Sequence, residues 1–260
     1  MRAARSFLGL PKNATSVGIL AEINWLEPLY RTQLRMVRQF FRVLKLSEEK
    51  LPKIIMLWDK NISDRLGYQT WYSEVKTIFD ANNMSEFFGQ GSCSESTIQK
   101  LKESMWVKQN VESRLNCLEK PKLRTFVTFK NFGSTPPYLL KPLSFVQRKF
   151  IAKIRLSALP IKIETGRYER PKLAINERLC PSCDDGLSIE NEEHFVFKCA
   201  KYSKIRQIWM DKLQKNEDFL TLDSSEKFKI IFDQSENIKL TAQFLINIFD
   251  LRSKIISKNA

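Results

Sequence analysis

The only histidine of this 260-residue chain, His194, lies among three of its five cysteines. The segment has the pattern Cys-x2-Cys-x10-His-x4-Cys, formed by Cys180, Cys183, His194 and Cys199. Structural zinc sites use four thiolate or imidazole ligands in a tetrahedron, and this soft donor set favours zinc over hard cations. Because four protein ligands leave no position for a reacting water, the pattern predicts one structural, non-catalytic Zn²⁺ ion.

The alternative is two buried cysteines, an accidental third and a lone histidine in the core. Asp184-Asp185-Gly186, between the two ligand pairs, favours a turn. The sequence also gives no set of residues for nucleophilic catalysis, because one histidine cannot serve both as ligand and as general base. Cys93 and Cys117 are expected to be buried side chains and not nucleophiles. We therefore expect a protein that is not an enzyme and has no small-molecule substrate.

The composition is strongly basic, with 43 Lys and Arg residues against 29 Asp and Glu and a formal net charge of +14. Such an excess attracts polyanions, either nucleic acid or an anionic membrane face. No run of 18 apolar residues is present, so no membrane span is expected. The expected partner is RNA or DNA, bound mainly through its backbone, with no membrane involved.

The cysteines and the N-terminus indicate the compartment. An odd number of cysteines with a metal-type cluster favours a reducing, intracellular environment over a disulfide scaffold. Residues 1–10 carry Arg and Ala without an acid, as mitochondrial transit peptides do. Pro11 and Gly18 interrupt this segment, so we expect the nucleus or the cytoplasm rather than a mitochondrial address.

Apolar periodicity predicts a mainly α fold. The first part should be a helical, bundle-like region over 1–132, followed by a linker and connecting helix over 133–160. A zinc module with closing C-terminal helices should occupy 161–260. A short strand or an extended arm is expected over 124–130, which carries β-branched and aromatic residues. The expected helices cover 27–46, 50–66, 69–80, 95–119, 143–157, 202–213, 224–233 and 237–257.

The helix expected over 27–46 has an apolar side and an adjoining basic stripe. The apolar positions are Tyr30, Leu34, Val37, Phe41 and Leu44, and the stripe consists of Arg31, Arg35, Arg38, Arg42 and Lys45. No acidic residue lies between Glu27 and Glu48, so nothing within the helix neutralises the stripe. A phosphate backbone would relieve this self-repulsion. The alternatives are an ordinary solvated face or an acidic partner elsewhere in the fold.

A second basic and aromatic stretch precedes and surrounds the first cysteines. Arg167, Tyr168 and Arg170 are its candidate nucleic-acid contacts, since cations neutralise phosphates and an exposed tyrosine stacks on an unpaired base. The alternative is that Tyr168 packs against the zinc module and the cations are scattered. Further members of the stretch are Arg155, Lys162, Lys172 and Arg178, with Glu190–Glu193 as a nearby acidic patch.

Several segments resemble the region downstream of the polymerase core in non-LTR (LINE-type) retrotransposon reverse transcriptases. The least specific are FLGLPK at 7–12 and NWLEPL at 24–29, followed by RLSALP at 155–160 and IETGRY at 163–168. The most specific are ERLCPSC at 177–183 and NEEHF with its continuation FKCAKY, over 191–202. The resemblance covers most of the chain, from about residue 5 to the end.

The resemblance implies a helical thumb-like region and a C-terminal zinc-knuckle domain that hold template RNA or target DNA. Cys180, Cys183, His194 and Cys199 would then be ligands, and Arg35, Arg38 and Arg42 backbone contacts. The chain departs from the family in having no aspartates in a polymerase context, since its one Asp-Asp pair is Asp184-Asp185. We therefore expect a non-catalytic fragment. The alternatives are a helical protein-interaction scaffold with a structural zinc and a decayed element remnant without a cellular function.

Overall fold

The computed structural model describes residues 1–89, 94–183, 186–213, 217–234 and 236–259. Within these residues the chain forms helices and short helical turns, with no strand beyond an isolated antiparallel bridge between Leu179 and Ile189. This confirms the mainly α fold. None of the helices described is long and apolar enough to cross a membrane.

The chain forms two compact units, which we call unit 1 and unit 2. Unit 1 comprises Met1–Asn24 and Ser113–Ala260, and unit 2 comprises Trp25–Glu112. This division differs from the boundaries expected near residues 132 and 160. The expected linker contributes α10 (Phe145–Arg155), which packs against both α1 (Arg2–Leu8) and α14 (Ile238–Asn259). Because its apolar side chains belong to one core with those helices, this segment is part of unit 1.

Unit 2 is built around α3, whose apolar side packs into an aromatic core. Leu34, Val37 and Phe41 are buried as predicted, and Phe40 is buried between Trp71, Tyr72 and Phe88. The helices of this unit are α3 (Pro28–Leu44), α4 (Leu51–Leu66), α5 (Trp71–Asp80), α6 (Ser85–Gly89) and α7 (Glu95–Leu118), the last of which extends into unit 1.

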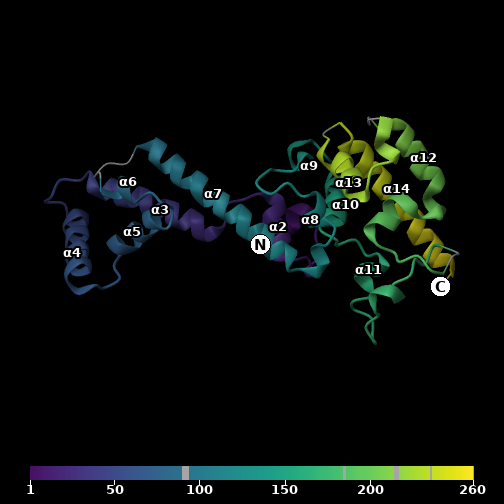
Figure 1. Cartoon of the computed structure of the whole chain (residues 1–260), viewed down its shortest axis with the longest axis horizontal. Helices are drawn as coiled ribbons and strands as arrows, with labels where there is room; N and C mark the ends of the chain where they lie inside the picture. Colours follow the sequence, from purple (N-terminus) through teal and green to yellow (C-terminus); the bar gives the residue numbers. More distant parts are fainter. Residues whose placement is uncertain (90–93, 184–185, 214–216, 235, 260) are drawn as a thin grey trace. The chain divides into compact units, whose positions relative to one another are not determined.

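In unit 1, α14 is the central element, and α10, α12 and α13 pack against it (Figure 1). Trp209 stacks on Phe244 with 4.0 Å between ring centroids, and Ile248 is fully buried. The other elements are α1, α2 (Ser16–Ile23), α8 (Phe126–Phe129), α9 (Pro137–Leu140), α11 (Lys162–Thr165), α12 (Ser203–Lys212), α13 (Ser224–Asp233) and short turns at Pro121–Leu123, Ile175–Glu177, His194–Lys198, Ala200–Tyr202 and Glu217–Leu220.

Two expectations for local structure were wrong. The extended segment over 124–130 is the short helix α8, because Phe126 and Phe129, three positions apart, are both buried on one side. On α7, helical spacing predicts that Leu101, Met105, Val111, Leu115 and Leu118 lie in the core. Leu101 and Met105 are buried, yet Val111, Leu115 and Leu118 are each more than half exposed. Periodicity identifies side chains that share a face of a helix, but it does not show that another element covers that face.

A buried ion pair holds together segments of unit 1 that are distant in sequence. Arg155 on α10 is 1% exposed and donates to both carboxylate oxygens of Glu22, at 2.5 and 3.2 Å. Its guanidinium also lies over the Phe129 ring, 4.8 Å from the centroid. Removal of either partner would leave the other as an uncompensated buried charge, which strongly destabilises a fold.

Replacing Arg155 with methionine should therefore lower the free energy of unfolding of unit 1 by about 3–5 kcal/mol, because Glu22 loses its main partner. Urea denaturation followed by circular dichroism measures this change. Arg38→Met is the control, since Arg38 and Glu95 form an exposed pair that is expected to contribute less than about 1 kcal/mol. Equal effects of the two substitutions would show that the buried pair is not a structural tie.

Candidate metal centre

The four residues of the Cys-His pattern converge in unit 1. Their ligand atoms all lie within 4.8 Å of one another. The Cys183 Sγ atom is 3.2 Å from His194 Nε2 and 3.4 Å from Cys199 Sγ. Tetrahedral bonds of about 2.3 Å place sulfur ligands about 3.8 Å apart, so the cluster is close to the required size. The four residues could bind one metal ion.

A tight hairpin-like loop positions the first two ligands. The Cys180 backbone N–H donates to the Ser188 carbonyl at 2.7 Å, next to the bridge between Leu179 and Ile189. Gly186 has φ +58°, the left-handed conformation that turns adopt readily at glycine. Asp184 and Asp185, expected to form the turn with it, lie outside the described residues. The loop brings Cys180 and Cys183 to one side of the cluster.

A π-helical turn positions the other two ligands. It runs over His194–Lys198, and the Cys199 N–H donates to the His194 carbonyl at 2.8 Å. Because i→i+5 hydrogen bonding returns the chain after about five residues, ligands five positions apart come to lie on the same side. The Asn191 side chain accepts the His194 N–H at 2.8 Å and fixes the start of the turn.

The surroundings of the cluster include supporting residues that the sequence analysis missed. Arg206 on α12 donates to the carbonyl oxygens of Val196 and Cys199, at 2.9 and 2.7 Å. The Tyr202 hydroxyl bonds that of Ser182 at 3.0 Å. These contacts hold the loop, the π-turn and α12 in one arrangement. Of the residues that support the cluster, only Asn191, at the start of the π-helical turn, has a local signal in the sequence, because asparagine is a preferred residue at helix starts.

Glu190 joins the metal cluster to the rest of unit 1. Arg252 on α14 donates to its two oxygens at 2.5 and 2.7 Å, and the Lys162 N–H donates to it at 2.5 Å. From the sequence, we expect Glu190–Glu193 to be an acidic patch that weakens the positive field of the nearby basic stretch. Glu190 and Glu192 are instead buried, and each is paired with an arginine, so they act inside the fold.

The thiols of the cluster influence one another strongly. A hydrogen bond from Cys199 lowers the pKa of Cys180 to about 4, with a further contribution from His194. The pKa of Cys199 is raised by its bond to Cys180 and by burial. A thiolate is therefore already favoured at neutral pH at one position of the cluster, and thiolate is the form that binds metal ions.

The basic stripe of α3 lies in unit 2, and its five members, Arg31, Arg35, Arg38, Arg42 and Lys45, are all exposed. Arg38 is 3.4 Å from Glu95. Among the described residues the other four have no carboxylate within ion-pair distance. A shallow cavity of about 230 Å³ is lined by Arg38, Arg42 and Lys45 together with residues at the start of α7. The stripe is therefore available to an external anion.

The second basic stretch is only partly available. Tyr168 is 58% exposed and donates to Glu164 at 3.2 Å, Arg170 is exposed, and Arg167 is half-buried against Glu164. The expectation that Arg155 and Arg178 belong to this surface was wrong. Arg155 pairs with Glu22 inside unit 1, and Arg178 is 3% exposed and donates to backbone carbonyl groups of Leu173 and Ile163.

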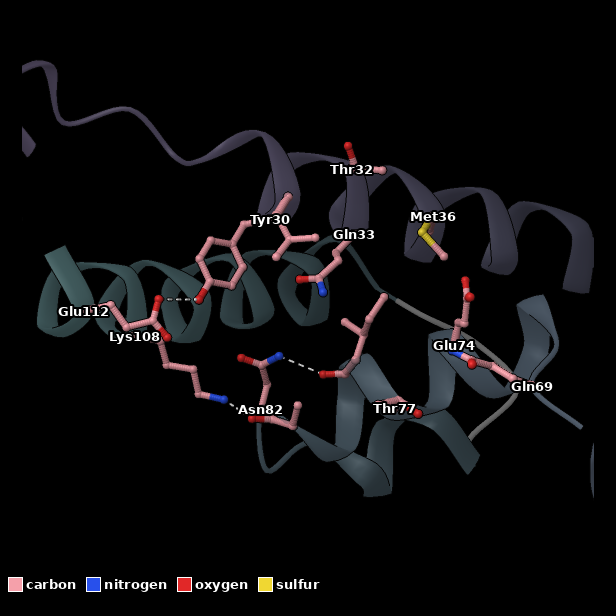
Figure 2. A pocket seen from close by; sticks show the side chains of 13 residues that line it. Tyr30, Thr32, Gln33, Met36, Gln69, Glu74, Thr77, Asn82, Lys108 and Glu112 are labelled. Atoms are coloured by element: carbon pink, nitrogen blue, oxygen red, sulfur yellow. Dashed lines mark hydrogen bonds between the residues drawn. The ribbon is translucent and has the colours of Figure 1, made fainter. Parts of the chain in front are cut away.

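A cavity of about 490 Å³ lies in unit 2 among α3, α5 and α7 (Figure 2). Three of its polar side chains donate to other residues of the lining. Tyr30 donates to Glu112 at 3.2 Å, Lys108 donates to the Ala81 carbonyl, and Asn82 donates to the Ile78 carbonyl at 2.7 Å (Figure 2). Burial, with Glu112 next in effect, raises the pKa of Tyr30. Three polar side chains of this lining are therefore engaged within the unit.

No family model, curated protein or solved structure matches this chain.

Cys117 should differ from the three cysteines of the cluster in reactivity. It is fully buried, and burial raises the pKa of its thiol to about 11, so at pH 8 it stays protonated. Iodoacetamide at pH 8 should therefore modify Cys183, which is partly exposed, well before Cys117 in the native, metal-free protein. Peptide mapping by mass spectrometry identifies each site. Rapid native modification of Cys117 would contradict its placement in the core.

Proposed function

We propose that Cys180, Cys183, His194 and Cys199 hold one structural Zn²⁺ ion. The observation that carries this proposal is the convergence of three sulfur atoms and one imidazole nitrogen within 4.8 Å. Soft thiolates with imidazole are the donor set of structural zinc sites. When bound, zinc would supply a cross-link between the loop and the π-helical turn. The π-helical turn is bonded to α12 through Arg206, and Glu190, which follows the loop, is bonded to α14.

We further propose that the protein is a non-catalytic nucleic-acid-binding fragment of the LINE-type reverse-transcriptase kind, which holds RNA template or target DNA. The exposed stripe of α3, with one carboxylate partner among the described residues, supports this proposal. Arg167, Tyr168 and Arg170 would add contacts from unit 1. The proposed origin rests on the resemblance of the segments around the cysteines.

An alternative function is a helical protein-interaction scaffold with a structural zinc. One observation favours it, namely that α4 leaves Leu51 and Trp58 67% and 64% exposed, with Ile54 and Ile55 about half exposed. Contiguous exposed apolar side chains are typical of protein interfaces. The two functions differ in the salt dependence of binding. For binding through phosphates of duplex DNA, the logarithm of the association constant falls linearly with the logarithm of the salt concentration, with a slope of about −0.9 per phosphate contact.

Zinc loading should stabilise unit 1 selectively, because the ligand set exists only when this unit is folded. Hydrogen exchange should show added protection in Met1–Asn24 and Ser113–Ala260 on zinc addition, and no change in Trp25–Glu112 away from the boundary. The Cys183→Ser variant should lose this response. Zinc-dependent protection that is equal in both units would contradict a site confined to unit 1.

Reversing the charge of Arg35, Arg38 and Arg42 to Glu should weaken binding to RNA or DNA at least tenfold at low salt and lower the salt slope. The reason is that three backbone contacts are replaced by repulsion. Fluorescence anisotropy with a labelled oligonucleotide measures both quantities. The matched control reverses Arg65, Lys76 and Lys102, which are exposed in the same unit on α4, α5 and α7. Equal losses in the two variants would mean that only net charge matters.

A further inference from the structure

The positive charge of the chain is concentrated in unit 1. Unit 1 has 30 basic and 18 acidic residues, against 13 and 11 in unit 2. Two of its segments, 1–21 and 120–163, contain 13 basic residues and no acidic ones. The two segments include α1 and α10, which pack against each other. Two elements that are far apart in sequence and contain no acidic residue therefore lie against each other.

Part of this charge is neutralised inside the fold and part is not. In segment 120–163, five cations have carboxylate partners from elsewhere in the chain: Lys122, Arg124, Lys130, Arg155 and Lys162. Lys141, Arg148, Lys149 and Lys153 have no carboxylate within 4 Å among the described residues. Burial, with Lys149 next in effect, lowers the pKa of Lys153, which fits a crowded group of like charges.

Specific contacts join α10 to the end of α1. The Arg148 Nε atom donates to the Phe7 carbonyl at 3.0 Å, and the guanidinium lies over the Phe7 ring, 4.4 Å from its centroid. The aliphatic part of the Lys149 side chain packs on Gly9, which ends α1 with φ +62°. A Cβ atom added at Gly9 would lie 2.8 Å from the Lys149 side chain, so a larger residue would not fit there without a shift. The cations are therefore held in place and not distributed at random.

Aromatic rings are exposed beside these cations. Phe7 is 46% exposed, and Phe145, the first residue of α10, is 50% exposed and lies 5.9 Å from the Arg148 guanidinium. Aromatic side chains bury a large apolar area when the fold covers them, and here two phenylalanine rings remain about half exposed beside one arginine. We call Phe7, Phe145, Arg148, Lys149 and Lys153, together with the exposed Lys141 four residues before the start of α10, the α1–α10 surface.

We propose that the α1–α10 surface binds single-stranded nucleic acid, with its cations on phosphates and a phenylalanine ring stacked on an unpaired base. This inference rests on the proposed nucleic-acid-binding function and adds a site outside α3 and the zinc module. Rows of cations with interleaved aromatic rings are how sequence-tolerant single-strand sites are built. An anionic membrane fits less well, because insertion needs a continuous apolar face. Along α10, Ile151, Ala152 and Ile154 are buried in the core, and the exposed apolar side chains Phe145 and Val146 are confined to its first turn.

Two variants of the full chain test the proposal with a labelled single-stranded RNA, measured by fluorescence anisotropy over a range of salt concentrations. Lys141→Glu with Lys149→Glu should reduce the slope of log K against log salt concentration by about 1.4 in magnitude, which is about 0.7 for each lost contact with a single strand. Phe7→Leu with Phe145→Leu keeps apolar bulk but removes stacking, and should weaken binding at least about fivefold. The charge-matched control is Lys229→Glu with Lys239→Glu, exposed on α13 and α14 of the same unit.

The outcomes separate this inference from the proposed function. If the wild type binds RNA and both α1–α10 variants match the control, this inference alone fails. If the wild type binds neither RNA nor DNA, both fail. Equal losses on a duplex of the same sequence would overturn the stacking role. Binding to phosphatidylserine vesicles that both variants lose, with RNA binding unchanged, would assign the surface to an anionic membrane.

Discussion

Unit 1 depends on buried glutamates that find their cationic partners in distant parts of the chain. Glu22 binds Arg155, Glu190 binds Arg252 and Glu192 binds Arg124, and in each pair at least the carboxylate is almost fully buried. A carboxylate inside a protein is costly unless it is paired and hydrogen-bonded, so each pair tolerates only the arrangement that brings both partners together. Glu22 ties α2 to α10, whereas Glu190 and Glu192 tie the segment between the two ligand pairs to α14 and to Arg124. The metal cluster is therefore joined to the rest of unit 1 by buried ion pairs.

The same pairing separates cations with a structural role from those that remain for a partner. Arg155 and Arg178 are buried and bonded within unit 1, whereas the α3 stripe and the α1–α10 surface remain open. The net charge does not distinguish buried, paired cations from exposed ones. A buried ion pair and two separated surface charges of opposite sign make the same contribution to the net charge. A phosphate backbone can contact only the cations that are exposed at the surface. The nucleic-acid proposal therefore rests on these two surfaces and not on the total charge of +14.

Local features were predictable from the sequence, and long-range ones were not. The helical pattern of α3 and the ligand pattern around His194 follow from spacing alone, because both are set by residues within a few turns of each other. The partnership of Glu22 with Arg155 joins positions 133 residues apart and has no local signal. For the same reason, the sequence could not show that α10 belongs to the core with α1 and α14. The exposure of Val111 and Leu115 on α7 also depends on which neighbouring elements cover that side of the helix. Periodicity in the sequence does not predict this.

The central claim is that the Cys-His cluster is a metal site of defined stoichiometry. Its most direct test is the metal content of the freshly purified, reduced protein by plasma mass spectrometry, beside a His194→Ala variant. We expect one zinc ion per chain in the wild type and its loss or strong depletion in the variant. Wild-type protein without zinc that also fails to take up one equivalent on reconstitution would contradict it. The convergence of four side chains would then be core packing alone.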